Sequence, residues 1–166
     1  MRIGCHWQGH RRSSHDHYGD DGLALDRRNN FFADVLEYLA RACAELGKFD
    51  DAWRWLNGAT AAMQTSKESW WEAEIGRIEG ELALKAPPDA ARAEAYFERA
   101  LAVARQQQAK SWELRAAMSL ARLWRDQGKA QQARELLASV YGWFTEGFDT
   151  RDLKEAKALL EELAAE

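Results

Sequence analysis

Three stretches of this sequence decide its fold: Ala52-Trp53-Arg54-Trp55-Leu56-Asn57-Gly58-Ala59, Ala93-Glu94-Ala95-Tyr96-Phe97-Glu98-Arg99-Ala100 and Ala133-Arg134-Glu135-Leu136-Leu137-Ala138-Ser139-Val140. A small residue opens each stretch, a large apolar residue follows four positions later, and a small or β-branched residue follows at seven. Positions i, i+4 and i+7 lie on one face of an α-helix. The stretches therefore predict a helix face that recurs three times and lets two helices approach closely.

The rest of the chain predicts further helices around these stretches. Hydrophobic residues make up 46% of the sequence and there are only 2 Pro, which favours packed helices. Gly47 and Gly128 each follow a repeated helix and predict C-caps with positive φ. Gly80 predicts the same cap in the middle copy, with a longer connection through Pro87 and Pro88. Six turn signals after Asn30 separate seven expected helices.

The predicted fold is all-α: a right-handed superhelix of about three helix pairs with a C-terminal closing helix. Residues 1–29 contain all four His, show no helical period and are interrupted by Gly and Asp, so an irregular tail is expected there. The helical-repeat domain is expected to span 30–166. Its repeats are expected at 30–64, 69–108 and 111–147, and its closing helix at 150–165.

Charge and hydropathy exclude several classes of partner. The net charge is -4 and the pI is about 5.7, whereas nucleic-acid-binding domains depend on an excess of Lys and Arg. No apolar run is long enough for a transmembrane helix, and the N-terminus lacks the apolar stretch of a secretory signal. A cytoplasmic protein without nucleic-acid or membrane partners is expected.

A resemblance to a known family lies in the segment Glu45-Leu46-Gly47-Lys48-Phe49-Asp50-Asp51-Ala52. It resembles the helix junction of a tetratricopeptide repeat, in which a Gly, an aromatic residue and an Ala hold these relative positions. The copies here are longer than the standard repeat of 34 residues. The segments 70–82, 96–105, 111–117, 120–124 and 142–150 resemble the C-terminal helical-repeat region of bacterial signalling proteins that join a class III adenylate cyclase or DNA-binding domain to an AAA-type ATPase.

Motifs for catalysis are absent from the sequence. The Gly-Lys pairs at Gly47 and Gly128 are followed by Phe49 and Ala130 and lack the leading Gly of a phosphate-binding loop. Neither Gly-x-Ser-x-Gly, His-Glu-x-x-His nor Cys-x-x-Cys occurs. The ATPase and cyclase activities of the resembled proteins belong to other domains. A protein that is not an enzyme and needs no cofactor is therefore expected.

The tail holds the only cluster of soft metal ligands. A thiolate with imidazoles could bind Zn²⁺ tetrahedrally. The segment has no second ligand pair at zinc-finger spacing, so a solvated tail without metal is the preferred interpretation, and added Zn²⁺ is expected to leave helicity and melting unchanged. The weak metal candidates are Cys5, His6, His10, His15 and His17.

The predicted partner-binding site is a concave groove. If the first helix of each pair lines this groove, as in the resembled repeats, the charge of its inward positions shifts along the groove from mixed to basic. The arginines at its basic end suit bidentate binding of carboxylates. The alternative is a solvated face paired to Glu113, Asp126 and Glu135. The Asn residues of the carboxylate-clamp repeats are missing, which argues against a chaperone-tail ligand. The candidate groove residues are Arg41, Arg77, Arg115, Met118, Arg122 and Arg125.

Aromatic residues and caps complete the structural expectations. Aromatic residues at helical spacing in a solenoid are usually core, and a Ser69–Glu72 capping box is expected to begin the middle helix pair. The expected core tryptophans are Trp53, Trp55, Trp70, Trp112 and Trp124.

Two functions follow from these observations. The leading expectation is a scaffold or adaptor of the tetratricopeptide type that binds a peptide or protein segment in its groove. The alternative is a separated regulatory or oligomerisation arm of a multidomain adenylate cyclase or ATPase signalling protein. In that case the main contact would be an uncapped apolar end, formed by Phe31, Phe32 and Leu36, which would favour homo-oligomers.

Overall fold

The computed structural model describes residues 31–66 and 69–165, without the side chains of residues 31–34, 37 and 66. This part of the chain forms seven helices and confirms the all-α class and the six predicted breaks. The predicted tail at 1–29 lies outside the described residues. The helices are α1 (Phe31–Glu45), α2 (Phe49–Ser66), α3 (Glu72–Ala83), α4 (Ala90–Gln106), α5 (Lys110–Asp126), α6 (Ala130–Tyr141) and α7 (Arg151–Leu163).

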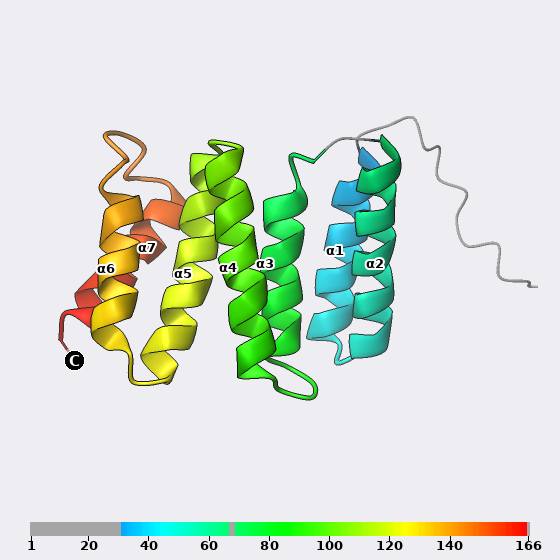
Figure 1. Ribbon diagram of the computed structural model, residues 1–166, viewed down its shortest axis with the longest axis horizontal. Coiled ribbons are helices and arrows are strands. Elements are labelled where there is room, and N and C mark those ends of the chain that lie inside the picture. The colour runs from blue at the N-terminus through cyan, green and yellow to red at the C-terminus, as the bar shows by residue number, and fades with distance from the viewer. Residues whose placement is uncertain (1–30, 67–68, 166) are drawn as a thin grey trace, which may run out of the picture.

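The helices pack as sequential pairs, α1 with α2, α3 with α4 and α5 with α6, and α7 closes the row (Figure 1). Contacts between pairs are uneven. The backbone of each odd-numbered helix lies close to that of the next odd-numbered helix, whereas among the described residues the backbones of the even-numbered helices do not approach one another closely, and α2 meets α4 through the side chains of Trp53, Tyr96 and Arg92. We call the layer of odd-numbered helices the inner layer and the layer of even-numbered helices the outer layer.

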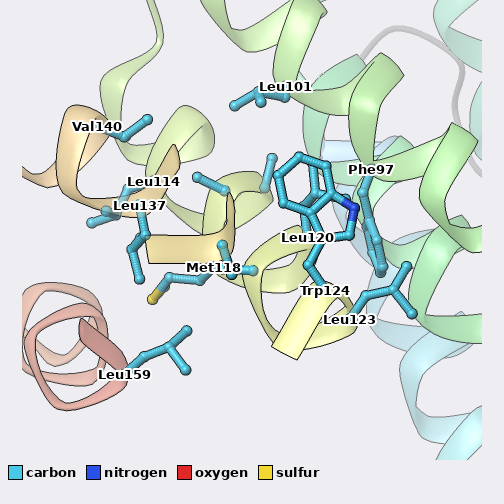
Figure 2. Packing of buried hydrophobic residues seen from close by; sticks show 14 of the residues in the cluster. Phe97, Leu101, Leu114, Met118, Leu120, Leu123, Trp124, Leu137, Val140 and Leu159 are labelled. Carbon is cyan, nitrogen blue, oxygen red and sulfur yellow. The ribbon is translucent and has the colours of Figure 1, made fainter. Parts of the chain in front are cut away.

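The recurring helix face is buried as predicted. Its nine positions in α2, α4 and α6 are each at most 1% exposed: Ala52, Leu56, Ala59, Ala93, Phe97, Ala100, Ala133, Leu137 and Val140. The core falls into two clusters, one shared by α1, α2 and α3 and the other running from α3 to α7. Figure 2 shows the second cluster, in which side chains from α4, α5, α6 and α7 interlock. Close-packed interiors of this kind set the distances between helices.

The two predicted glycine caps are confirmed, and the third is wrong. Gly47 and Gly128 have φ values of 73° and 75°, a conformation that costs other residues free energy. Gly80 lies inside α3, where its missing side chain makes room for the ring of Phe97. The connection from α3 to α4 spans 84–89 and is longer than those after α1 and α5.

The tryptophans are less uniformly buried than expected. Trp124 is 9% exposed, and its indole N–H donates to Glu94 at 2.6 Å. Trp53 and Trp55 are partly buried against the first cluster. Trp70 is 45% exposed, so its assignment to the core was wrong, because it precedes α3 instead of facing a partner helix.

The predicted capping box at the start of α3 is also wrong. The residue that precedes the helix is Trp71, and no side chain caps the free backbone N–H groups there. Ser69 instead accepts a backbone hydrogen bond from Glu72 through its carbonyl oxygen. No helix within the described ranges is both long enough and apolar enough to cross a membrane.

Candidate functional site: the inner face

The inner face begins with a buried ion-pair network on α3. The Arg77 guanidinium donates two hydrogen bonds to the Glu74 carboxylate, at 2.8 and 2.7 Å, and a third to Glu81. Burial by itself would lower the pKa of Arg77, but these bonds and the attraction of both carboxylates raise it above its ordinary value. Arg77 is 7% exposed, so it organises the helix layer and is not open to a ligand.

Arg115 joins three inner helices. From its place on α5, it donates to Asp152 of α7 at 2.7 Å and lies 3.7 Å from the Glu74 carboxylate of α3. Its guanidinium also lies over the ring of Trp112, 5.0 Å from the ring centroid. The guanidinium therefore lies between a carboxylate of α3 and a carboxylate of α7. These two contacts orient the side chain across the inner layer.

Two further arginines of α5 pair with α7. Arg122 donates to Glu155 at 3.4 Å, and Arg125 donates to Glu162 at 2.9 Å and to Asp126 on its own helix. Of the paired-face partners predicted from sequence, Asp126 pairs with one of these arginines, whereas Glu113 accepts from Arg105 and Lys110 and Glu135 accepts from Gln131. Sequence reasoning missed the acidic face of α7, although Asp152, Glu155 and Glu162 share the 3.6-residue period that would reveal it.

The remaining predicted groove residues divide between core and surface. Met118 is 3% exposed and packs in the second core cluster, so its assignment to the groove was wrong: it faces the interior of the α5–α6 pair. Arg41 lines a hollow of about 160 Å³ between α1 and α3. Glu45, Glu81 and Lys85 also line this hollow, which gives it a mixed charge.

One of the three residues expected to form an apolar self-association end, Leu36, belongs to the core. Leu36 is 3% exposed and packs with Ala40 and Leu56 in the first core cluster, so it does not belong to an open apolar end. The side chains of Phe31 and Phe32 lie outside the described residues. Among the described side chains of α1, the large apolar one that is exposed is Tyr38, at 67%.

Metal binding has no support in the described part of the chain. Residues 31–66 and 69–165 contain no group of three or more His, Cys, Asp or Glu placed to hold an ion. The candidates Cys5, His6, His10, His15 and His17 all lie outside those ranges.

Comparisons with known proteins do not place the chain in a family. No protein-family model matches the sequence, and no curated protein matches it. What the geometry supports is an all-helical protein of seven described helices packed in sequential pairs.

Proposed function

We propose that this chain is a non-enzymatic protein–protein interaction module of the tetratricopeptide type, which holds a peptide or protein segment on its inner face. The observation that carries the proposal is the uneven approach of neighbouring pairs: the backbones of the inner helices lie close together, and those of the outer helices lie further apart. A row of helix pairs packed in this way curves toward its inner helices. Stacked repeats that curve present a concave surface on which one segment meets several helices.

The chemistry of the inner face favours a segment of mixed charge. The hollow between α1 and α3 offers Arg41 and Lys85 beside Glu45 and Glu81. Along α5, the side chains of Arg115 and Arg122 are 36% and 42% exposed. Their guanidinium groups have donors left for a further carboxylate, because each Arg carries five N–H bonds. An acidic residue of the segment is therefore expected to lie over α5.

The test is a selection of peptides from a displayed random library against the full chain, followed by titration of the selected peptides. The triple variant Arg115→Ala, Arg122→Ala and Arg125→Ala is expected to weaken binding by about tenfold or more, as hot-spot arginines do. The matched control, Lys48→Ala, Arg54→Ala and Arg134→Ala, removes the same charge from exposed positions elsewhere.

Circular dichroism melting separates loss of binding from loss of fold, since exposed ion pairs add little to stability. A library that yields no binder, or an inner-face triple variant that binds like the control, would contradict the proposal.

A further inference from the structure

A second hollow opens on the outer face, where α2 and α4 leave α3 uncovered. It measures about 260 Å³. Gly76 of α3 is one of its lining residues and carries no side chain; α4 approaches this glycine so closely that an added Cβ would lie 3.4 Å from the Cβ of Ala100. We call this hollow the outer cleft; it is lined by Thr60, Met63, Gln64, Ser69, Glu72, Ile75, Gly76, Glu79 and Arg99.

Glu79 lines the outer cleft without a direct hydrogen bond or ion pair among the described residues. Its side chain is partly buried. Burial raises the pKa of Glu79, although Arg99 and Arg92 act through space in the opposite direction. An acidic group removed from water without a hydrogen-bond partner costs folding free energy. Such a cost is typical of groups kept for binding.

Arg99 and Arg92, the two cations near Glu79, make their direct contacts with other residues. Arg99 lies 3.2 Å from the Glu72 carboxylate. Arg92 donates to the Tyr96 hydroxyl at 3.2 Å, and its guanidinium lies over the ring of Trp53, 4.8 Å from the centroid. Because Glu72 already neutralises Arg99, the Glu79 carboxylate leaves the lining of the cleft with one negative charge in excess.

We propose that the outer cleft receives a lysine side chain of a protein partner, with its ammonium on Glu79 and its methylene stem along Met63. The cleft is smaller than the 300–1,000 Å³ typical of small-molecule sites, which suits a single side chain. A lysine places a compact charge at the end of a thin apolar stem, whereas arginine needs room for a planar fork. The site lies away from the inner face and does not depend on the function proposed there.

Nuclear magnetic resonance titration of the ¹⁵N-labelled full chain tests this assignment. The probe is N-acetyl-lysine N′-methylamide, and its neutral counterpart is N-acetyl-norleucine N′-methylamide. The lysine probe is expected to shift the backbone amides of Gly76 and Glu79 in a saturable way. Its dissociation constant is expected to be about fivefold lower than that of the neutral probe, as for a partly exposed ion pair.

Variants of the cleft give effects of opposite sign. Glu79→Gln is expected to weaken the lysine probe by about fivefold. Arg99→Gln is expected to strengthen it, because the cleft then carries more negative charge. The matched control is Glu98→Gln, which removes a carboxylate from an exposed neighbour outside the cleft and is expected to change nothing.

Three results would overturn the proposal. The first is the absence of saturable shifts, and the second is equal affinity of Glu79→Gln and the unchanged chain. The third is n-butylammonium binding as tightly as the lysine probe, which would assign the cleft to free organic amines instead of a protein partner.

Discussion

At the scale of single residues, α3 and α4 pack closely where Gly80 faces the ring of Phe97. A Cβ added at Gly80 would lie 2.6 Å from Cδ1 and 2.9 Å from Cζ of the Phe97 ring. Phe97 is 1% exposed and has no space into which to move, since interiors are close-packed. The glycine is therefore kept for space and not for backbone conformation.

Gly80→Ala is expected to destabilise the protein by about 1–3 kcal/mol through overpacking. The control is Gly58→Ala on α2, where the nearest side-chain atom, Leu36 Cδ1, is 3.6 Å from an added Cβ. That change is expected to stabilise by up to about 1 kcal/mol, because Ala favours helix over Gly. Urea denaturation measures both. Recovery of stability in Gly80→Ala with Phe97→Leu would confirm the steric cause, and equal stability of the two alanine variants would contradict it.

Two glutamates on neighbouring inner helices have opposite pKa shifts. Glu113 is buried at the start of α5 and accepts hydrogen bonds from Lys110 at 2.8 Å and Arg105 at 3.0 Å. Burial acts to raise the pKa of Glu113, but these two cations lower it below its ordinary value. Burial without a direct partner raises the pKa of Glu79. The folded protein thus stabilises the charged form of Glu113 and destabilises the charged form of Glu79.

The pH dependence of unfolding should separate the two glutamates. Because the folded pKa of Glu113 is lowered, the stability that its charged form contributes is present at neutral pH and is lost as pH falls through that lowered pKa. Glu113→Gln is therefore expected to cost about 1–2 kcal/mol at neutral pH and less in acid. Because the folded pKa of Glu79 is raised, its penalty is absent in acid and grows as pH rises through that pKa.

Glu79→Gln should consequently stabilise the protein at neutral pH and have no effect in acid. Thermal melting of both variants across this pH range is the measurement. Parallel curves for the variants and the unchanged chain would show that neither carboxyl titrates with a shifted pKa.

At the scale of elements, α7 combines an apolar face with an acidic face. Leu153, Ala156, Leu159 and Leu163 are buried against the second cluster, while the acidic side chains pair with α5. Apolar burial supplies most of the stabilisation, because exposed ion pairs contribute less than about 1 kcal/mol each. The acidic face mainly sets how α7 lies on α5 and how much positive charge α5 presents.

Neutralising this acidic face should affect binding more than stability. The variant Asp152→Asn, Glu155→Gln and Glu162→Gln is expected to lose about 1 kcal/mol of stability or less and to bind acidic library peptides more tightly, since the α5 arginines are released. Leu159→Ala is the contrasting variant and is expected to cost about 3 kcal/mol. Weaker binding of acidic peptides by the neutralised variant would argue against a ligand over α5.

At the scale of the whole molecule, the two core clusters meet at α3 and share the partly buried Trp53. Beyond this junction, α1 and α2 pack closely only against each other and α3, and α2 meets α4 through the side chain of Trp53. In rows of repeats, stability is a sum of unit terms and nearest-neighbour terms, so regions can open separately. The α1–α2 pair has one neighbour, whereas the α3–α4 pair has two.

Hydrogen exchange should therefore be faster in α1 and α2 than in α4 and α5. Leu56→Ala, in the first cluster, is expected to lower protection in α1 and α2 while leaving α5 and α6 nearly unchanged. Leu137→Ala, in the second cluster, is the counterpart and should lower protection from α4 to α7. Uniform loss of protection in both variants would show one cooperative unit and contradict this division.

The sequence by itself determined the helices, their breaks and the buried recurring face, because period and capping are local properties read from neighbouring residues. It also placed arginines on one face of α5. Tertiary structure alone decided what those arginines contact, since Asp152 lies far from Arg115 along the chain and nearby only after packing. Tertiary structure also decided that Gly80 makes room for the ring of Phe97. It placed Met118 and Leu36 in the core and the outer cleft beside Glu79. Each depends on distances between helices, which periodicity does not encode.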